Sequence, residues 1–413
     1  MSTEEREFDV VVWGATGFTG QLVAEYLLER YGVDGPLRWA LGGRNESKLA
    51  VLRTQLAKQV PAAGTLPLVV GDGDDAAFLE TLAARTRVVC TTVGPYVLYG
   101  SKLVAACARG GTHYCDLTGE LQWMRRMIDA HHGDAQASGA RIIHAAGFDS
   151  IPSDLGVWFL QREMTARHGV PSRRVKMRAK GFSGGMSGGT IASMLAMMDE
   201  QGRDPEVRRI FADPYALNPD GERSGPDENE SMAPAYDEDF GSWTGPFVMA
   251  PCDTRIVRRT NALLGYAYGK DFRYDEAMLT GAGPGGFAKA AALSAGLVGG
   301  MSALAVGPLR RLVATRLPAP GEGPTREQQE QGYYDLRFFG AHPEDEGKGL
   351  RAQVTGDRDP GYGSTSKILG EVAVCLALDE LSVGGGFWTP ASALGGALLD
   401  RLESNAGLAF AIV

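Results

Sequence analysis

The N-terminal segment FDVVVWGATGFTG, residues 8–20, constrains the fold of this chain more than any other part of the sequence. Its apolar run, from Val10 to Trp13, has the length and β-branched content of a strand that is buried on both faces. Glycines then recur at a regular spacing, and a segment with helical periodicity follows them. A buried strand that leads through a glycine-rich turn into a helix predicts a dinucleotide-binding unit.

Each glycine of this turn has a separate task. Gly14 permits the tight turn, Gly17 lets a pyrophosphate approach the backbone, and Gly20 lets the helix pack closely against the strand. The N-terminus of the helix then offers free N–H groups and the positive end of its dipole to the phosphates. We therefore expect the cofactor to contact the whole turn, which consists of Gly14, Ala15, Thr16, Gly17, Phe18, Thr19 and Gly20.

The end of the next expected strand, Leu37 to Gly43, indicates which nucleotide is bound. A fold that prefers NAD places Asp or Glu there, to bond the ribose 2′-hydroxyl. This chain instead has Arg44 and Asn45, with Lys48 one helical turn further on. Cationic side chains suit a 2′-phosphate, so the sequence predicts NADP(H). The alternative is a solvated Arg and Lys that open a helix.

Alternating strands and helices continue through residues 1–150. We expect further strands at 67–72, 87–93, 112–117 and 140–146, and helices at 46–59, 75–85, 101–109 and 121–138. This alternation predicts an α/β fold, a Rossmann-type doubly wound parallel sheet with right-handed crossovers. Asp72 ends one strand in the usual neighbourhood of the adenine, and Val93, Gly94 and Pro95 lie where such a sheet forms its ligand crevice.

Five ordered motifs together resemble a known family, the saccharopine-dehydrogenase-like oxidoreductases, and within it the branch of trans-acting enoyl reductases. The motifs are GATGFTG, GGRNESKL, TVGPY, GTHYCDLTGE and AGFDSIPSDLG, and the C-terminal DPGYGSTSKILGE is also typical of that branch. The resemblance covers most of the chain, although residues 200–250 match no motif. It implies NADPH-dependent reduction of an enoyl thioester that a polyketide synthase carries during lipid assembly.

That chemistry indicates which catalytic groups to look for. Hydride addition at the β-carbon of an enoyl thioester leaves an enolate, which needs hydrogen-bond donors at its oxygen and an acid at the α-carbon. Tyr96, directly after the TVGP turn, is our first candidate for acid or oxyanion donor, with a packing aromatic as the alternative. Asp149 and Glu120 also follow strands, so either could orient the nicotinamide or the substrate, or cap a helix.

Two other functions stay open at this point. The family also includes reductases that form saccharopine from an amino-acid imine, and the run from Arg255 to Arg259 could bind such a substrate. A solvated strand or helix edge explains the same run more simply. The other function is a non-catalytic, lipid-associated scaffold that uses the nucleotide domain as a sensor, because a fold alone does not fix an activity.

Residues 151–360 are expected to form a second, α+β domain with an antiparallel sheet, for substrate binding or dimerisation, and residues 361–413 a helical segment that returns to the first domain. Strict alternation at 175–182 places Lys176, Arg178 and Lys180 on one strand face, which predicts a solvated face or an anion site. The glycine-rich loop that follows predicts either a mobile loop or a substrate-binding anion cradle, formed by Ser187, Gly188, Gly189 and Thr190.

Two segments of the second domain have unusual composition. Residues 213–246 are rich in Pro, Gly, Ser and acidic residues, which predicts a long exposed or disordered loop, with a lid over the substrate as the alternative. Residues 290–309 carry no charge and are long enough to span a membrane. Because Ala and Gly dominate them, we expect a buried or interface helix, with peripheral membrane contact as the second option.

Overall composition narrows the classes of function and the locations that remain for this protein. The net charge of −9 gives no basic surface for nucleic acid. Five cysteines without a C-x-x-C pair are typical of reduced thiols in a cytoplasmic protein, and the six histidines show no metal-ligand spacing. The acidic N-terminus lacks the apolar core of a signal peptide. We therefore expect a cytoplasmic protein without a metal, either free or peripheral at the inner face of the plasma membrane, and compatible with a homodimer.

Overall fold

A computed structural model describes residues 6–184, 188–305 and 323–413, and the chain divides into two compact units. The first unit holds residues up to Ile151 together with Gly361–Gly407. The second unit holds Pro152–Pro320, Pro324–Pro360 and Leu408–Val413. The chain therefore passes from the first unit into the second after Ile151, returns to the first unit for Gly361–Gly407, and ends in the second.

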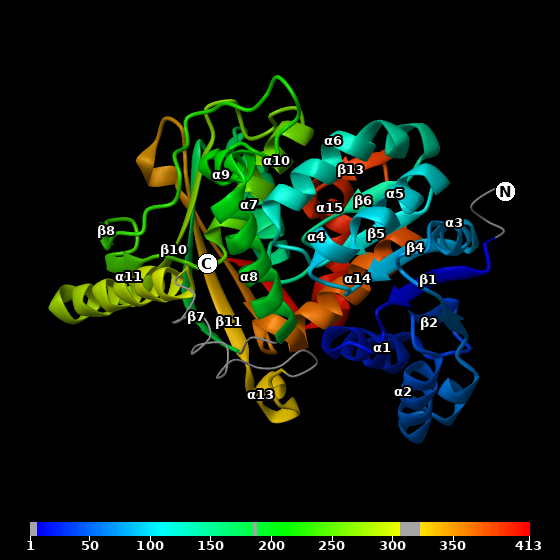
Figure 1. Ribbon diagram of the computed structural model, residues 1–413. Coiled ribbons are helices and arrows are strands. Elements are labelled where there is room, and N and C mark those ends of the chain that lie inside the picture. Colours follow the sequence, from blue (N-terminus) through cyan, green and yellow to red (C-terminus); the bar gives the residue numbers. More distant parts are fainter. Residues whose placement is uncertain (1–5, 185–187, 306–322) are drawn as a thin grey trace. The chain divides into compact units, whose positions relative to one another are not determined.

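The first unit contains a seven-stranded sheet in which every neighbouring pair is parallel. In spatial order its strands are β13 (Gly386–Trp388), β6 (Arg141–Ile143), β5 (His113–Asp116), β4 (Thr86–Thr91), β1 (Phe8–Trp13), β2 (Trp39–Gly43) and β3 (Leu68–Val70) (Figure 1). This is the doubly wound α/β sheet that the sequence predicts. The edge strand β13 was not predicted, because three residues after a glycine run carry no periodic signal.

Helices connect these strands as crossovers. They are α1 (Phe18–Tyr31), α2 (Glu46–Gln59), α3 (Ala76–Arg85), the short α4 (Tyr96–Tyr99), α5 (Ser101–Gly110) and α6 (Leu121–Ser138). Local chemistry sets their ends: Asn45 and Asp75 cap the first turns of α2 and α3, and Gly139 ends α6 in the left-handed conformation. The C-terminal helices α14 (Thr365–Leu378) and α15 (Pro390–Arg401) belong to the same unit, where α14 packs on α1 and on the central strands.

The second unit contains a seven-stranded mixed sheet. In spatial order its strands are β14 (Leu408–Ile412), β12 (Leu350–Gly356), β11 (Tyr333–Ala341), β7 (Arg174–Ser183), β10 (Arg273–Gly281), β9 (Ser242–Gly245) and β8 (Ala235–Asp237) (Figure 1). We expected an antiparallel sheet, but β7 and β10 pair in parallel, and a long crossover connects them. The final residues are not helical either, since β14 pairs with β12.

The helices of the second unit are α7 (Ile151–His168), α8 (Gly188–Arg203), α9 (Pro205–Ala212), α10 (Ala250–Leu263), α11 (Gly283–Ala305) and α13 (Arg326–Gln331). On β7 the apolar face is buried, as the alternation predicts, but the opposite face is not simply solvated. Lys176 and Arg178 form ion pairs with Asp237 at 2.9 and 2.6 Å, and Arg178 is buried. These cations are therefore neutralised within the unit and do not form a free anion site, while Lys180 remains exposed.

Helix α11 is not the buried helix that was one expectation for this stretch, and an interface helix stays a prediction. It is long and apolar enough to cross a membrane, yet only 11% of its most apolar window is buried inside the protein. It packs on β9 and β10 near its beginning, and Figure 1 shows it extending from that part of the second unit. Residues 306–309, the end of the apolar stretch, lie outside the described residues.

Candidate functional site

The glycine turn between β1 and α1 has the conformation that its sequence predicts. Gly14 has a φ of +87°, which disfavours any residue with a side chain. A Cβ atom on Gly20 would lie 2.2 Å from the carbonyl oxygen of Gly14, so only glycine allows this packing of helix on strand. Gly17 is exposed and precedes α1 without a side-chain cap. The first N–H groups of α1 are therefore available to an anion.

The other residues of the turn support this arrangement. Ala15 is buried, the carbonyl oxygen of Thr16 accepts a 3.0 Å bond from the Gln21 side chain, and Thr19 is half-buried. The Phe18 ring packs edge-on against Tyr362, with 5.2 Å between ring centroids. These contacts fix the backbone. The N–H groups of Gly14, Ala15 and Gly17 already donate to the carbonyl oxygens of Gly42 and Gly14, so the N–H groups that an anion would use are those at the start of α1.

The turn after β4 lies directly against the glycine turn. A Cβ atom on Gly14 would lie 2.5 Å from Cγ2 of Val93, and the hydroxyl of Thr92 donates a 3.3 Å bond to the carbonyl oxygen of Gly14. Val93, Gly94 and Pro95 are all half-buried. The structure thus brings together the two strand ends where the sequence predicts the ligand crevice.

The expected 2′-phosphate site follows β2. Arg44 and Lys48 are exposed, and neither side chain pairs with another residue in the described part of the chain. Asn45 caps α2, because its side-chain oxygen accepts a 2.9 Å bond from the N–H of Lys48. Asp72, after β3, is also exposed and accepts a 3.0 Å bond from the N–H of Asp74. Two cations are therefore free to bind a phosphate at this end of the sheet.

Tyr96 is buried, and its hydroxyl is already engaged with the backbone. The hydroxyl donates a 3.2 Å bond to the carbonyl oxygen of Thr91 and accepts a 3.4 Å bond from the N–H of Leu117. Burial, and then the negative charge of Asp116, hold the pKa of Tyr96 well above its usual value. These contacts agree with the packing alternative, and a role for Tyr96 as acid or oxyanion donor stays a prediction.

Glu120 fixes the turn that carries Tyr96. Its carboxylate is fully buried and accepts bonds of 2.8 and 2.7 Å from the N–H groups of Tyr96 and Val97. A carboxylate at a helix N-terminus is favourable because it pairs the free N–H groups. Glu120, in the loop that follows the neighbouring strand β5, therefore caps α4. It also positions the turn of Val93, Gly94 and Pro95, which we call the crevice turn.

Asp149 is the least constrained of the three predicted catalytic residues. It is half-buried and lies beside Gly147, where an added Cβ atom would be 3.2 Å from its Oδ2. The hydroxyl of Thr365 accepts a 2.9 Å bond from the N–H of Phe148 and so holds this loop to the start of α14. Burial, with a contribution from the negative Asp116, raises the pKa of Asp149 to about 7. A carboxyl group with that pKa can donate a proton at neutral pH.

Two further residues of this cluster were missed by the sequence analysis. Asp116 ends β5 and His144 follows β6, and both side chains are buried. Oδ2 of Asp116 lies 2.7 Å from Nδ1 of His144, which places the proton of a neutral imidazole on Nδ1. Nε2 of His144 is buried and has no hydrogen-bond partner among the described residues. The imidazole is thus oriented by a carboxylate and keeps one nitrogen available to a proton.

The backbone beside this pair is strained. Ala145 has a φ of +54°, which is unusual for a residue with a side chain, and its N–H donates a 3.2 Å bond to Oδ1 of Asp116. Such strain is typical of functional sites. The signal that could have found the pair is its position, because Asp116 and His144 follow adjacent buried strands and each begins a loop of a recognised motif.

The predicted substrate cradle is described only in part. Ser187 lies outside the described residues, and α8 begins at Gly188 and continues through Gly189. Thr190 is exposed in the first turn of α8. The methionine-rich part of this helix is half-buried, so it presents soft apolar side chains at the surface of the second unit.

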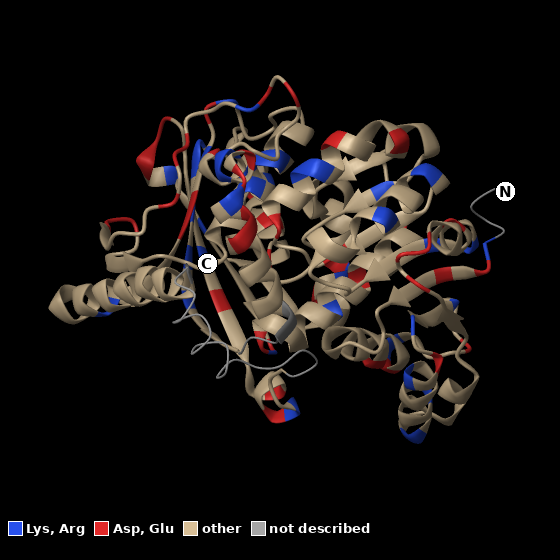
Figure 2. Cartoon of the chain, in the orientation of Figure 1, with Lys and Arg blue, Asp and Glu red and all other residues tan. Residues whose placement is uncertain are grey.

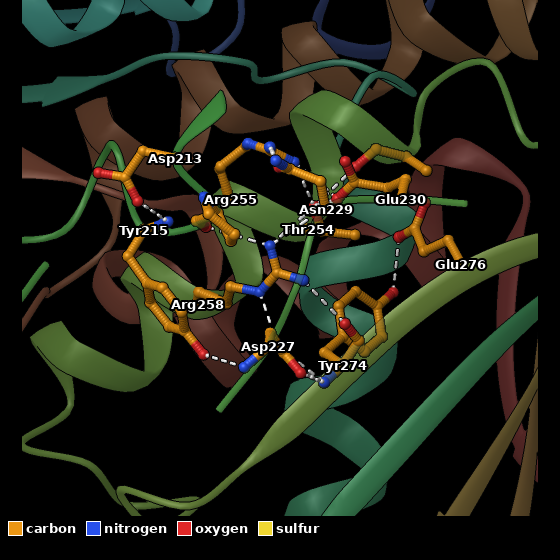
Figure 3. Close-up of polar contacts among 12 residues, drawn as sticks. Asp213, Tyr215, Asp227, Asn229, Glu230, Thr254, Arg255, Arg258, Tyr274 and Glu276 are labelled. Carbon is orange, nitrogen blue, oxygen red and sulfur yellow. Dashed lines mark hydrogen bonds and ion pairs between the residues drawn. The ribbon is translucent and has the colours of Figure 1, made fainter. Parts of the chain in front are cut away.

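The arginines of α10 are not a substrate site. Figure 3 shows Arg255 and Arg258 surrounded by acceptors, and their side chains are only 1% and 3% exposed. Arg255 pairs with Glu230 at 2.6 Å, and Arg258 pairs with Asp227 at 2.7 Å. Arg259 is also buried. The expectation of a solvated edge is therefore wrong, and both guanidinium groups are already used within the unit.

The same contacts correct part of the expectation for residues 213–246: most of residues 220–236 form an exposed loop, as the composition predicts, but this loop is held to α10. The segment is not a free excursion, because Tyr215, Ala216 and Leu217 are buried and Asp227 and Glu230 bond α10. The strands β8 and β9 add its later part to the sheet. Burial alone would raise the pKa of Glu230, but the charge of Arg255 and the hydrogen bonds from Arg255 and Thr254 together lower that pKa. The segment is a tightly held part of the second unit.

The first unit therefore fits a dinucleotide with a 2′-phosphate. The close packing at Gly20 and the uncapped start of α1 suit a pyrophosphate, and Arg44 and Lys48 suit the additional phosphate. The crevice turn is held by Glu120, and Asp149 and His144 supply titratable groups in the neighbouring loops. Such an arrangement can bind NADP(H) and provide a proton close to a reduced substrate.

Comparison with known proteins agrees with this description. A family model described as the saccharopine dehydrogenase NADP-binding domain matches residues 10–143, so NADP(H) is the cofactor. The structure also resembles the apo form of saccharopine dehydrogenase (L-Glu forming) from Saccharomyces cerevisiae. The match covers 98% of this chain and 99% of that one, with a TM-score of 0.54 and 12% identity, and therefore shows a shared fold.

Curated relatives are much closer in sequence. A trans-acting enoyl reductase of Mycobacterium ulcerans is 41% identical over 98% of each chain. A trans-acting enoyl reductase of Mycobacterium tuberculosis is 42% identical over 97% of each chain. Because both matches extend over nearly the whole length, the chain belongs to the family of trans-acting enoyl reductases, and it is an NADP-dependent oxidoreductase with the saccharopine dehydrogenase fold.

Proposed function

We propose that this protein reduces the carbon–carbon double bond of an enoyl thioester with NADPH, and that a polyketide synthase carrier domain presents the acyl chain during lipid biosynthesis. The observation that carries the proposal is the cluster after β4, β5 and β6, in which an NADP-binding turn adjoins protonatable groups. The names of the relatives support the choice of an enoyl substrate. The arginine pairs of α10 remove the one feature that favoured an amino-acid adduct.

When bound, NADPH supplies the hydride that the β-carbon of the substrate receives. The chain's own residues bind and orient it. The glycine turn and the first N–H groups of α1 hold the pyrophosphate, and Arg44 with Lys48 holds the 2′-phosphate. Glu120 keeps the crevice turn in place through its two bonds to the backbone of α4.

Asp149 is the proton donor of the proposed reaction. Its pKa of about 7 leaves a large protonated fraction at neutral pH, whereas an ordinary Asp carboxyl would be almost fully ionised. The carboxyl group delivers this proton to the α-carbon. The pair of Asp116 and His144 is the second candidate, because Asp116 orients the imidazole and Nε2 of His144 has no hydrogen-bond partner among the described residues.

The acyl chain requires an apolar surface. The half-buried methionines of α8 are soft apolar side chains of the kind that suits one, and Thr190 lies in the first turn of the same helix. A cytoplasmic location fits this chemistry, since all five cysteines are free and buried.

Turnover assays test the proposal. The purified protein is mixed with NADPH and trans-2-enoyl thioesters of N-acetylcysteamine with short and long chains, and the loss of NADPH absorbance is followed. We expect enoyl-dependent oxidation that is faster for the longer chains and slower with NADH. Oxidation with a mixture of amino acid and aldehyde, but not with any enoyl thioester, would support the saccharopine-type reaction instead. Tight NADPH binding without oxidation by any substrate would indicate a scaffold.

A further inference from the structure

Helix α11 has an apolar surface that the protein itself does not cover. The helix has 23 residues, and only Lys289 among them is charged, so Figure 2 shows it almost entirely without charge. Its apolar residues do not gather on one face. A helix that is apolar all round is normally buried, either in a protein core or in a membrane. Here only 11% of the most apolar window is buried in the protein.

The first half of α11 is attached to the sheet of the second unit. The Phe287 ring packs edge-on against Trp243 of β9, with centroids 4.9 Å apart. A Cβ atom on Gly245 of β9 would lie 2.9 Å from the Leu293 side chain, so helix and strand are in close contact. This attachment excludes a simple membrane-spanning role, because the same residues cannot pack on a strand and cross the hydrocarbon.

The second half of α11, Ala295 to Leu304, contains no buried residue and is mostly exposed. Val298 and Met301 are 47% and 49% exposed. The only hydroxyl in this half, that of Ser302, donates a 2.8 Å bond to the carbonyl oxygen of Val298. No side chain in this half therefore needs water as a hydrogen-bond partner, which makes the segment suited to an apolar medium.

Charge indicates what that medium is. Between Glu276 and Glu322 the sequence contains no acidic residue and four basic ones, which are Lys289, Arg310, Arg311 and Arg316. The chain as a whole has a net charge of −9, so this positive region is a local exception. It complements the anionic headgroups of a lipid bilayer.

Aromatic side chains lie at the attached end of the helix. Tyr236, Trp243 and Phe287 form a chain of edge-on ring contacts, and Tyr236 and Phe287 are each more than two-fifths exposed, at 43% and 46%. Tyr and Trp prefer the boundary between headgroups and hydrocarbon, where one end of the ring is apolar and the other is wet. These three rings lie at the end of α11 that packs on β9, where the helix would meet the membrane surface.

We propose that α11 is a monotopic membrane anchor. Its second half inserts into one leaflet of an anionic bilayer, while the aromatic group and Lys289 remain at the headgroup level. This inference does not depend on the enoyl substrate, because it rests on the surface of α11 and its surroundings alone.

Flotation of the full-length protein with lipid vesicles tests the anchor. One set of vesicles contains phosphatidylcholine alone, and the other contains a mixture of phosphatidylcholine and phosphatidylglycerol. The double variant Val298→Asp/Met301→Asp places charges in the exposed half of α11. The control is Val51→Asp, which adds one acidic side chain at a 57% exposed position of α2 in the first unit. NADPH affinity of each variant confirms that it is folded.

We expect the wild type and Val51→Asp to float with the mixed vesicles and less with phosphatidylcholine alone. The double variant should bind the mixed vesicles about ten-fold or more weakly, because an acidic side chain is costly in hydrocarbon. Equal flotation of the double variant and the wild type would overturn the proposal. A wild type that stays with neither vesicle, but sediments as a dimer that the double variant converts to a monomer, would assign α11 to a second copy instead.

Discussion

At the scale of single residues, the candidate site divides into residues whose roles follow from local sequence and residues whose roles do not. Gly14 and Gly20 could be predicted, because their conformational requirements arise within a few residues of chain. The pairing of Asp116 with His144 could not, since it depends on β5 and β6 being neighbours. Glu120 shows the same limit: its carboxylate caps α4, which is distant in sequence, rather than the helix that follows it.

Removal of Arg44 should abolish the preference for NADPH. A charge-assisted contact with the 2′-phosphate contributes about 1.5–3 kcal/mol, so Arg44→Ala should raise the Kd for NADPH about 10- to 100-fold. The Kd for NADH should change little, and titration calorimetry measures both. The control Lys58→Ala removes a positive charge from α2, at the end far from the cofactor, and should behave like the wild type. An unchanged preference in Arg44→Ala would contradict this assignment.

Asp149 should make both stability and activity depend on pH. Its pKa rises from an ordinary 3.8 to about 7 in the folded protein, so the folded state holds the proton more tightly than the unfolded state. This contribution to stability is complete below the ordinary pKa and is lost as the pH rises through 7. Asp149→Asn should therefore raise the Tm relative to wild type at pH 8 but not at pH 4, as measured by scanning calorimetry.

The same carboxyl group should set the alkaline limb of the activity profile. If Asp149 donates the proton, kcat/KM of the wild type falls above pH 7, and Asp149→Asn is slow and lacks this limb. His144→Gln serves as the comparison, because it removes the imidazole and leaves Asp149 in place. A limb that disappears in His144→Gln but persists in Asp149→Asn would make the imidazole the donor.

At the scale of elements, composition was a reliable guide to the parallel sheet and a poor guide to the second unit. The helices α2 and α6 begin and end where their periodicity and caps predict. The arginines of α10 resemble a solvated helix face in sequence, because arginine usually lies at the surface. Their burial becomes visible only when the acidic segment before α10 folds onto them.

The ion pairs of α10 should stabilise the second unit without changing the affinity for NADPH. Asp227→Asn removes the nearer of the two carboxylates that pair with the buried Arg258, at 2.7 Å against 3.8 Å for Glu230, and should cost about 3 kcal/mol of folding free energy. Asp220→Asn is the control in the same segment, because Asp220 is largely exposed and pairs only with a partly exposed arginine. Urea unfolding measures the difference, and NADPH titration should give the same Kd for both variants. Equal stability of the two variants would show that the buried pair contributes little.

At the scale of the whole molecule, the order of elements along the chain explains how one sequence builds two units. The first unit uses the N-terminal strands and recovers α14 and α15 from the C-terminal part, and β14 then completes the second sheet. The alternation of the first half predicted the nucleotide fold. The exposed state of α11 could not be predicted, because an apolar helix has the same sequence whether protein or lipid covers it.

The most direct test of the whole account is to follow the transferred atoms in the product. The protein is supplied with a trans-2-enoyl thioester and NADPH that carries deuterium at the transferable position of C4, and the saturated product is analysed by mass spectrometry. We predict one deuterium at the β-carbon, and one at the α-carbon when unlabelled NADPH is used in deuterium oxide. A product without deuterium at the β-carbon, or no saturated product, would contradict the proposed reduction.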